Sequence, residues 1–263
     1  MFGELLKTWR KSEGLSQMAL SLRSDVSQRH LSFLESGRAR PSEDMVLHLG
    51  DILGLSLRHQ NALLTSAGVA PRFSESQWQS AGLEPVQKAV DFMLKQHEPF
   101  PAWVVDARWR MLQANRSARV LMNVFMEELP LLFCDDGLPN VMRLTLHPQG
   151  MAPYIENLNE VATHLLQRLQ QEARYHPETE NLYAELKEYF PELKPTVSTV
   201  GHSPVMSTRF VKDGLSLDLF SMITTLGTPT DIMLQELRIE SLFPANEQSE
   251  VLLKQFLSHA TDE

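Results

Sequence analysis

Apolar and polar positions over the first 70 residues alternate at the spacing of short amphipathic helices. Apolar residues recur three or four positions apart in five runs, which predicts five helices. Four runs follow residues that favour a helix start, and four end at a glycine, which readily terminates a helix. The starting residues are Ser16, Ser27, Pro41 with Ser42, and Ser56, and the terminal glycines are Gly14, Gly37, Gly54 and Gly68. The pattern predicts an all-α five-helix domain over residues 1–70.

The helical periodicity of apolar residues ends after this domain. Residues 71–82 contain Pro71, three serines and Trp78, and they show neither helical nor strand periodicity. We interpret this segment as a linker. The remaining residues, 83–263, then form a second domain.

The first half of the second domain combines helices with a hairpin. Pro85 stands at the start of a predicted helix. Apolar residues occupy odd positions on both sides of a short turn within residues 102–115, which predicts a tight hairpin, and Asn115 can cap the helix that follows. Helical periodicity returns over residues 152–174, the most periodic segment of the chain, and over residues 178–190.

In the last third of the chain, the pattern of apolar and polar residues becomes typical of β-strands. Alternating leucines over residues 215–219 follow the turn dipeptide Asp213–Gly214, and residues 230–243 predict another strand. A final helix is predicted over residues 247–258. The second domain is therefore expected to be mixed, with an antiparallel sheet, and the fold class of the whole chain is α+β.

Charge divides the chain in the same place. The net charge is −9, but residues 1–70 carry +1 and the remainder carries −10, which indicates different functions for the two parts. The sequence contains no apolar stretch of 18 residues and no basic segment followed by an apolar run at its start, so we expect a cytoplasmic protein without a membrane span. The single cysteine, Cys134, cannot form an internal disulfide, which fits a reducing compartment.

Fifteen positions within residues 15–49 resemble the helix-turn-helix of xenobiotic-response-element-type regulators of phages and bacteria. Two short helices must cross steeply around a tight turn, so that the second projects a polar face into the major groove. Ser21 and Asp25 depart from the family pattern in ways that the fold tolerates, and Gly50 stands where the family prefers alanine, at a cost of about 1 kcal/mol in helix propensity. The matching residues are Leu15-Ser16-Gln17, Leu20, Val26-Ser27, Leu31-Ser32, Leu34-Glu35, Gly37, Arg40-Pro41-Ser42 and Leu49.

This resemblance implies roles for individual polar residues. Gln28, Arg29 and Ser32 lie at the start of the recognition helix and are expected to read base edges of a double-stranded DNA operator. A second group is expected to bind phosphates and fix the register on DNA. Its members are Arg10, Ser16, Gln17, Ser27, Arg38 and Arg40. Because one such domain reads only a few base pairs, we expect a homodimer on a near-palindromic site.

Motifs beyond the first domain resemble the MmyB-type transcription regulators over nearly the whole chain. They are Ala67-Gly68-Val69-Ala70-Pro71, Val104-Val105-Asp106 leading to Asn115, Asn140 to Pro148 with Arg143 and His147, and Thr228-Pro229 through Leu234-Gln235-Glu236-Leu237-Arg238-Ile239-Glu240 to Phe243-Pro244-Ala245. The resemblance implies a C-terminal ligand-binding domain of PAS-like topology, in which a curved antiparallel sheet and flanking helices enclose a cavity. In some of these regulators the cavity accepts a fatty acid.

Apolar residues on the predicted hairpin, the long helix and the late strands are candidates for the wall of such a cavity. They are Trp103, Val105, Trp109, Met111, Leu158, Leu165, Leu217, Leu219 and Leu237. A fatty acid would also need a cationic anchor for its carboxylate. Arg143 and His147, four positions apart on one expected helical face, and Arg209 are the candidates.

Three other functions compete with a regulator that responds to a small apolar ligand. The second domain could fill its core completely and serve only for dimerisation or protein interaction. A haem-type PAS sensor would need only one axial histidine. An enzyme is disfavoured, because the sequence lacks the Gly-x-Ser-x-Gly, phosphate-loop, His-Glu-x-x-His and Cys-x-x-Cys motifs, and Asp135-Asp136 before Gly137 is typical of a turn. We therefore expect no enzyme activity, no metal and no cofactor.

Overall fold

The computed structural model describes residues 2–126, 133–173, 176–193 and 205–259 and divides the chain into two compact units. The first unit comprises Met1–Gln77 together with Leu226–Gln235, and the second comprises Trp78–Thr225 and Glu236–Glu263. The boundary at residue 77 falls inside the predicted linker. The periodicity of residues 226–235, which lie between two strands of the second unit, does not indicate that they belong to the first unit.

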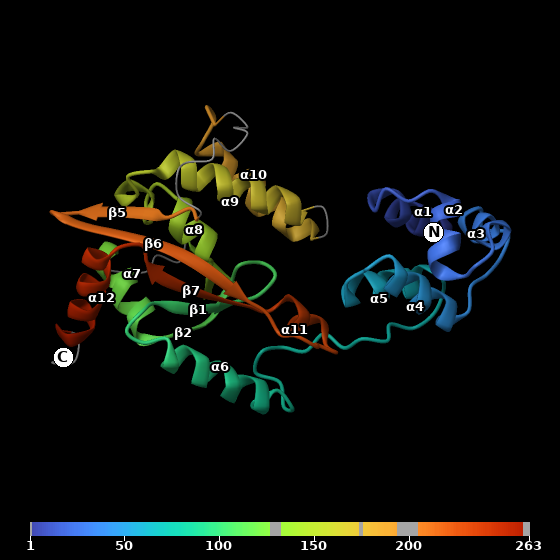
Figure 1. Cartoon of the computed structure of the whole chain (residues 1–263), viewed down its shortest axis with the longest axis horizontal. Coiled ribbons are helices and arrows are strands. Elements are labelled where there is room, and N and C mark those ends of the chain that lie inside the picture. The colour runs from blue at the N-terminus through green and yellow to red at the C-terminus, as the bar shows by residue number, and fades with distance from the viewer. Residues whose placement is uncertain (1, 127–132, 174–175, 194–204, 260–263) are drawn as a thin grey trace. The chain divides into compact units, whose positions relative to one another are not determined.

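The N-terminal part of the first unit is the five-helix domain that the sequence predicts (Figure 1). Its helices are α1 (Phe2–Ser12), α2 (Gln17–Ser24), α3 (Gln28–Glu35), α4 (Glu43–Ile52) and α5 (Leu57–Ser66). Their apolar faces meet in one core, in which leucines from every helix are fully buried. The leucines with no exposed surface are Leu6, Leu20, Leu31, Leu34, Leu49, Leu63 and Leu64.

Local capping explains why these helices begin and end where they do. The serine before each of α2 to α5 accepts a hydrogen bond from a backbone N–H in the first turn. Asp25 ends α2 with φ 54°, the left-handed conformation in which the resembled family uses glycine. Gly50 is explained by packing, because a Cβ there would lie 3.0 Å from Cγ of Gln60.

The second unit is built on a five-stranded, wholly antiparallel sheet with the order β2-β1-β7-β6-β5. This agrees with the expected α+β fold and with the PAS-like arrangement that the resemblance implies. The strands are β1 (Ala102–Val105), β2 (Met111–Ala114), β5 (Thr208–Lys212), β6 (Leu215–Thr224) and β7 (Arg238–Pro244), and a separate hairpin pairs β3 (Cys134–Asp135) with β4 (Leu138–Pro139).

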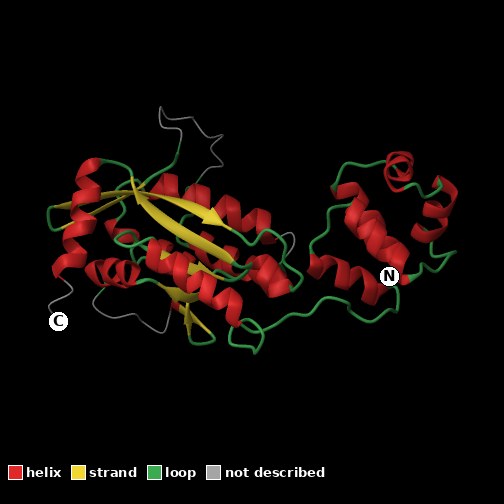
Figure 2. Ribbon diagram, turned by 60° about the horizontal axis from the view of Figure 1, so that its bottom comes forward, coloured by secondary structure: helices red, strands yellow, loops and turns green. Residues whose placement is uncertain are grey.

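Helices and connecting turns surround this sheet (Figure 2). Figure 1 shows α9 and α10 side by side, in contact along their lengths, while α12 packs against α7, β6 and β7. The helices are α6 (Glu84–Gln96), α7 (Arg116–Phe125), α8 (Val141–Leu146), α9 (Leu158–Ala173), α10 (Pro177–Glu188) and α12 (Glu247–His259), with a 3-10 turn η2 (Ala152–Tyr154) before α9. The short helix α11 (Ile232–Glu236), between β6 and β7, belongs up to Gln235 to the first unit.

Asn115 organises the hairpin of β1 and β2 as well as the helix that follows. Its side-chain oxygen accepts from the N–H of Ala118, which caps α7 as predicted, and also from the N–H of Ala102 at the start of β1. Its amide nitrogen donates to the carbonyl of Phe100. One buried side chain thus joins both ends of the hairpin to α7.

Two predicted elements differ from the structure. The helix expected over residues 152–174 begins only at Leu158, because the chain first makes a 3-10 turn and then extends at Ile155, which bridges to Phe210 of β5. The strand expected over residues 230–243 is wrong in its first half. Asp231 caps a helical turn there by accepting hydrogen bonds from the N–H groups of Met233 and Leu234.

Candidate DNA-binding surface and ligand cavity

Helices α2 and α3 form the helix-turn-helix, and α3 has one buried apolar face and one exposed polar face. Leu31 and Leu34 are fully buried in the core. Gln28, Arg29 and Ser32, the residues predicted to read bases, are exposed. Because residues three to four positions apart share a helix face, these polar side chains form one continuous surface at the start of α3. That surface has the chemistry and position required for major-groove contact.

Phe33 is a member of this surface that the sequence analysis missed. The guanidinium carbon of Arg29 lies 5.4 Å from the Phe33 ring centroid, and that of Arg38 lies 5.7 Å from it. Guanidinium groups at this distance over an aromatic ring are attracted by its π electrons. Phe33 therefore restrains a predicted base-reading arginine and a predicted phosphate-binding arginine before DNA arrives. The spacing of Arg29 and Phe33, one helical turn apart, was the available sequence signal.

Ser16 and Ser27, two of the predicted phosphate ligands, cap their own helices. The hydroxyl oxygen of Ser16 accepts from the N–H of Ala19 at 3.0 Å, and that of Ser27 accepts from the N–H of His30 at 3.2 Å. A hydroxyl that accepts one hydrogen bond can still donate its proton. Both serines are exposed, so each remains able to donate to a phosphate at a helix N-terminus.

The other phosphate candidates fall into two classes. Arg38 and Arg40 are exposed on the segment after α3. Gln17 is half-buried and donates one amide hydrogen to Oε2 of Glu35 at 2.9 Å, which leaves its second amide hydrogen for a phosphate. These three residues stay predicted phosphate ligands.

Arg10 is placed differently from the prediction, because its side chain is buried. Its Nε and Nη2 atoms donate to the two carboxylate oxygens of Glu35 at 2.6 and 2.9 Å, and Nη1 donates to the carbonyl of Leu15 at 2.6 Å. The hydrogen bond and charge of Glu35 outweigh burial and raise the pKa of Arg10. A guanidinium committed in this way cannot bind a phosphate. Arg10 instead fixes α1 against α3 and so positions the recognition helix.

The second unit contains an apolar cavity of about 260 Å³ between the sheet, α7, α8 and α9. This volume lies just below the usual range of small-molecule sites, roughly 300–1,000 Å³. The apolar residues that line it are Trp103, Trp109, Leu121, Met122, Val141, Met142, Met151, Val161, Leu165, Val205, Met206, Phe210, Leu219 and Leu242.

Four of the nine predicted wall residues line this cavity, namely Trp103, Trp109, Leu165 and Leu219. The other five do not: four of them are buried, and Leu158 packs half-buried against the core. These five are Val105, Met111, Leu158, Leu217 and Leu237. Alternation along strands and helices identified inward-facing residues but could not separate packed core from cavity wall.

Trp109 is the most constrained residue of the cavity wall. Its φ is 64°, a left-handed conformation that is strained for a bulky side chain, and it is only 1% exposed. The indole Nε1 donates to Glu172 at 2.8 Å, and the guanidinium carbons of Arg168 and Arg238 lie 4.6 and 4.8 Å from its ring. Glu172 also pairs with both arginines, at 3.1 and 3.0 Å. Non-glycine strain of this kind persists only where surrounding contacts enforce it.

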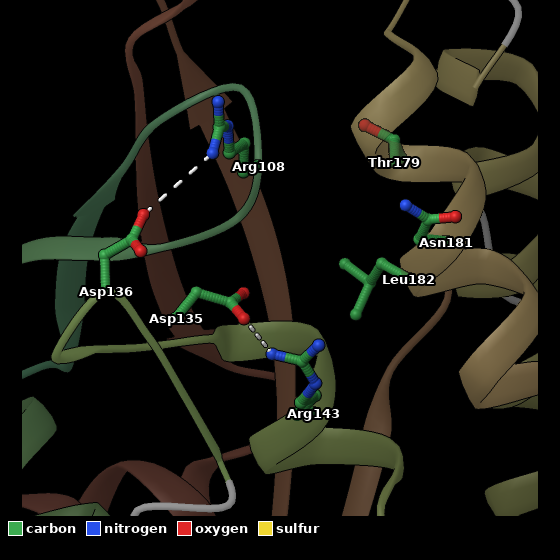
Figure 3. Close-up of a pocket in the computed structure, with 7 residues that line it drawn as sticks. All are labelled: Arg108, Asp135, Asp136, Arg143, Thr179, Asn181 and Leu182. Atoms are coloured by element: carbon green, nitrogen blue, oxygen red, sulfur yellow. Dashed lines mark hydrogen bonds and ion pairs between the residues drawn. The ribbon is translucent and has the colours of Figure 1, made fainter.

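The predicted carboxylate anchor Arg143 does not line the apolar cavity. Figure 3 shows it in a separate polar pocket, paired with Asp135, beside an ion pair between Arg108 and Asp136. Arg143 also donates to Glu185 at 2.7 and 2.8 Å. Both carboxylates raise its pKa. The charged groups of this pocket neutralise one another, which indicates a structural network.

His147 and Arg209, the other two predicted anchors, do not line the apolar cavity either. α8 ends at Leu146, and His147 follows in an extended conformation, so it does not share a helical face with Arg143. His147 is buried in contact with the rings of Phe133 and Tyr189, and this burial lowers its pKa, which keeps the imidazole neutral. Arg209 is exposed on β5 and pairs with Glu156 at 3.1 Å.

The structure places two other basic side chains at the apolar cavity. Arg168 and His164 lie one helical turn apart on α9, and both line it. The Nε of Arg168 binds Glu172, which leaves its terminal nitrogens as donors to a bound group. One acidic side chain also lines the cavity. Glu240 accepts a hydrogen bond from the indole N–H of Trp103 at 2.9 Å. The cavity is thus apolar with a few fixed polar groups, the usual composition of a small-molecule site.

Asp135 and Asp136 occupy the hairpin between β3 and β4, as the sequence predicts. Asp136 and Gly137 both have positive φ, 52° and 80°. Within the described ranges, no group of three or more His, Cys, Asp or Glu side chains is arranged to hold a metal ion. None of the described helices is long and apolar enough to cross a membrane.

Comparison with known proteins gives two family matches. The model described as "MmyB-like transcription regulator ligand binding domain" matches residues 86–256, and the model described as "Helix-turn-helix domain" matches residues 1–63. A comparison with curated proteins gives no match. One similar solved structure is described as that of an RNA-binding light-oxygen-voltage receptor, with 13% identity and a TM-score of 0.27 over 98% of this chain and 62% of that chain. The chain thus spans less than two thirds of that protein, and a likeness this low carries no argument.

Proposed function

The chain belongs to the family of MmyB-like transcription regulators, and from this premise we propose that a small apolar molecule in its cavity changes its affinity for a double-stranded DNA operator. The matching families are a regulator domain and a helix-turn-helix domain, not enzyme families. The observation that carries the proposal is the open apolar cavity at the centre of the second unit. A ligand that binds one conformation of the protein better than another shifts the population, and the DNA affinity shifts with it.

Fatty acids of modest length are the ligand class that we favour. Their chain suits the leucine, methionine and tryptophan walls, and their carboxylate can accept hydrogen bonds from Arg168. The cavity volume of about 260 Å³ favours a short chain. The same volume disfavours a haem, because a porphyrin macrocycle is a large, rigid ligand and would need extensive rearrangement of this wall. An absorption spectrum with a Soret band would support the haem alternative.

A second candidate function is a dimerisation or protein-interaction module without a small ligand. The cavity argues against it, because close packing is the rule in protein interiors and a core needed only for stability would gain by being filled. Native mass spectrometry of the purified protein distinguishes the two. A bound acyl compound supports the ligand, and an empty chain that also fails to bind added fatty acids supports the interaction module.

The ligand proposal predicts that dodecanoate changes the operator affinity of the wild-type protein by about five-fold or more, the usual size of allosteric coupling. Leu165→Trp fills the cavity and should abolish both dodecanoate binding and its effect on DNA. Leu158→Trp is the matched control, because Leu158 is also half-buried on α9 but does not line the cavity. Calorimetry with dodecanoate and fluorescence anisotropy with selected operator DNA measure the two effects. Equal operator affinity with and without bound dodecanoate would remove the ligand from the proposed function.

The helix-turn-helix also predicts a homodimer on DNA. One α3 contacts a single half-site, so specific binding uses two copies whose half-sites lie about one helical turn, or a multiple of it, apart. Light scattering of the protein bound to selected DNA should give two chains for each duplex. A footprint covering one unpaired half-site, bound by one chain, would contradict this expectation.

A further inference from the structure

Residues 226–235, which we call the return segment, leave the sheet of the second unit after β6 and rejoin it at β7. Between these two strands the segment belongs to the compact unit that contains the DNA-binding helices. A simple hairpin would have joined the strands directly, since β6 and β7 pair antiparallel from Leu219–Pro244 to Thr224–Ile239. The excursion therefore has a structural role other than strand connection.

Asp231 fastens the return segment to the residues that follow α5. Its Oδ2 atom accepts from the hydroxyls of Ser74 and Ser76, both at 2.8 Å, and from the N–H of Ser76 at 3.1 Å. The N–H of Ile232 donates to the carbonyl of Ser74 at 2.9 Å. Asp231 is buried, which by itself would raise its pKa, but the hydrogen bonds from both serines and from backbone N–H groups lower it. The carboxylate is thus ionised and accepts every one of these donors.

Gln235 fastens the other end of the segment directly to the DNA-binding domain. Its side-chain oxygen accepts from the N–H of Leu57 at 2.8 Å, in the first turn of α5. The N–H groups at the start of a helix have no partner within the helix, so a side chain that satisfies one stabilises that turn. The segment after α5 is held in turn by Asn61 of α5, whose side chain bonds the backbone of Arg72 and Phe73.

The strands on either side of the return segment form part of the cavity wall. Leu219 and Ser221 of β6 and Glu240 and Leu242 of β7 line the cavity. Arg238, the first residue of β7, lies only three positions after Gln235. Its guanidinium group contacts the ring of Trp109 and pairs with Glu172, as described above. Only Glu236 and Leu237 separate Gln235 from Arg238 in the sequence, so the backbone itself joins the cavity wall to the end of the return segment.

We propose that the return segment transmits the state of the apolar cavity to the DNA-binding helices, through Trp109 and Arg238 at one end and Asp231 and Gln235 at the other. The proposal rests on the function proposed above and names its physical route. A ligand that displaces Trp109 or the strands beside it moves Arg238 and the start of β7. That movement changes the hydrogen bonds of Asp231 and Gln235, and with them the first turn of α5.

The decisive experiment uses the full chain and needs no ligand. Leu165→Trp fills the cavity, and amide hydrogen exchange of residues 57–66 reports on α5. We expect Leu165→Trp to change this exchange several-fold, while Leu158→Trp leaves it unchanged. In backgrounds carrying Asp231→Ala or Gln235→Ala the change should disappear. Gln235→Ala is the milder variant, because it removes one side-chain acceptor and no buried charge. Lys254→Ala, at an exposed ion pair on α12, is the control background and should keep the full change.

The outcomes separate this inference from the proposed function. If Leu165→Trp leaves the hydrogen exchange of α5 unchanged, the proposed route through the return segment is wrong. It is also wrong if the change in exchange persists at full size in both the Asp231→Ala and the Gln235→Ala backgrounds. The DNA assay is read separately. Wild-type protein that binds dodecanoate without any change in operator affinity contradicts the proposed function. Where wild-type protein does respond, Gln235→Ala should still bind dodecanoate, while its effect on operator affinity falls from about five-fold or more to less than about two-fold.

Discussion

Replacing Glu35 by alanine is expected to lower the local unfolding free energy of α1 and α3 by about 3–5 kcal/mol, because it leaves the buried guanidinium of Arg10 without its charged partner. The exposed fractions of the two side chains are only 7% and 4%, so water cannot compensate the lost pair. The helices also meet closely here, since a Cβ on Gly3 would clash with the backbone carbonyl of Glu35. A loss of this size would disorder the surface that α3 presents to DNA.

Hydrogen exchange in α1 and α3 of the full chain measures this effect, since it reports local opening in a protein of two units. Arg58→Ala is the control variant. Its partner Glu75 is exposed, and such surface pairs contribute only about 0–1 kcal/mol. Equal, small effects of Glu35→Ala and Arg58→Ala would contradict the structural role of the Arg10–Glu35 pair.

The same pair predicts a dependence on pH. Burial alone would raise the pKa of Glu35, but hydrogen bonds from Arg10 and Gln17 and the charges of Arg10 and Lys7 lower it. A carboxyl whose pKa is lower in the folded state stabilises the fold at pH values above its unfolded pKa, about 4.3. This stabilisation is lost as the pH falls through the lower folded value. The protection factors of α3 amides, which are corrected for the intrinsic slowing of exchange in acid, should therefore fall as the pH is lowered, and Glu35→Gln should remove that component of the pH dependence.

The DNA-binding helices could be predicted from the sequence because their determinants are local. A serine cap, a terminal glycine and an apolar residue every three or four positions are all visible within one or two helical turns. The assignment of Arg10 failed for the opposite reason. Its partner Glu35 is 25 positions away, and only the packing of α1 on α3 brings the two together. An arginine near a DNA-binding surface has the same sequence signature whether it is free or buried.

The ligand cavity could be predicted only in outline. The spacing of apolar residues along strands and helices identified Trp103, Trp109, Leu165 and Leu219 as wall residues. The residues of α7 and α8 that complete the wall depend on how helices distant in sequence cross the sheet. The proposed anchor Arg168 was hidden for the same reason, within the most periodic helix of the chain. The return segment was hidden because its apolar residues continue into β7 and read as one strand. Its contacts with Ser74 and Leu57 span more than 150 positions.

Replacing Arg29 or Gln28 by alanine should weaken operator binding by about 1–3 kcal/mol each, which is roughly five-fold to 150-fold in dissociation constant. Each lost side chain should also relax the preference at one base position, because it removes hydrogen bonds to one base edge. Selection from random DNA followed by competition binding measures both effects. Arg40→Ala is the matched control among exposed arginines. As a phosphate contact it should weaken all sequences alike and reduce the slope of log affinity against log salt by about one.

Phe33→Leu tests whether the aromatic ring prepares this surface for DNA. The substitution keeps an apolar side chain on α3 but removes the π face beside Arg29 and Arg38. Operator affinity should therefore fall while helix stability, measured by hydrogen exchange in α3, changes little. A double mutant with Arg29→Ala should lose less than the sum of the two single losses, because both act through the same guanidinium. If Arg29→Ala weakened operator and random DNA equally, Arg29 would be a phosphate contact, and the base-reading role of this face would rest on Gln28 and Ser32.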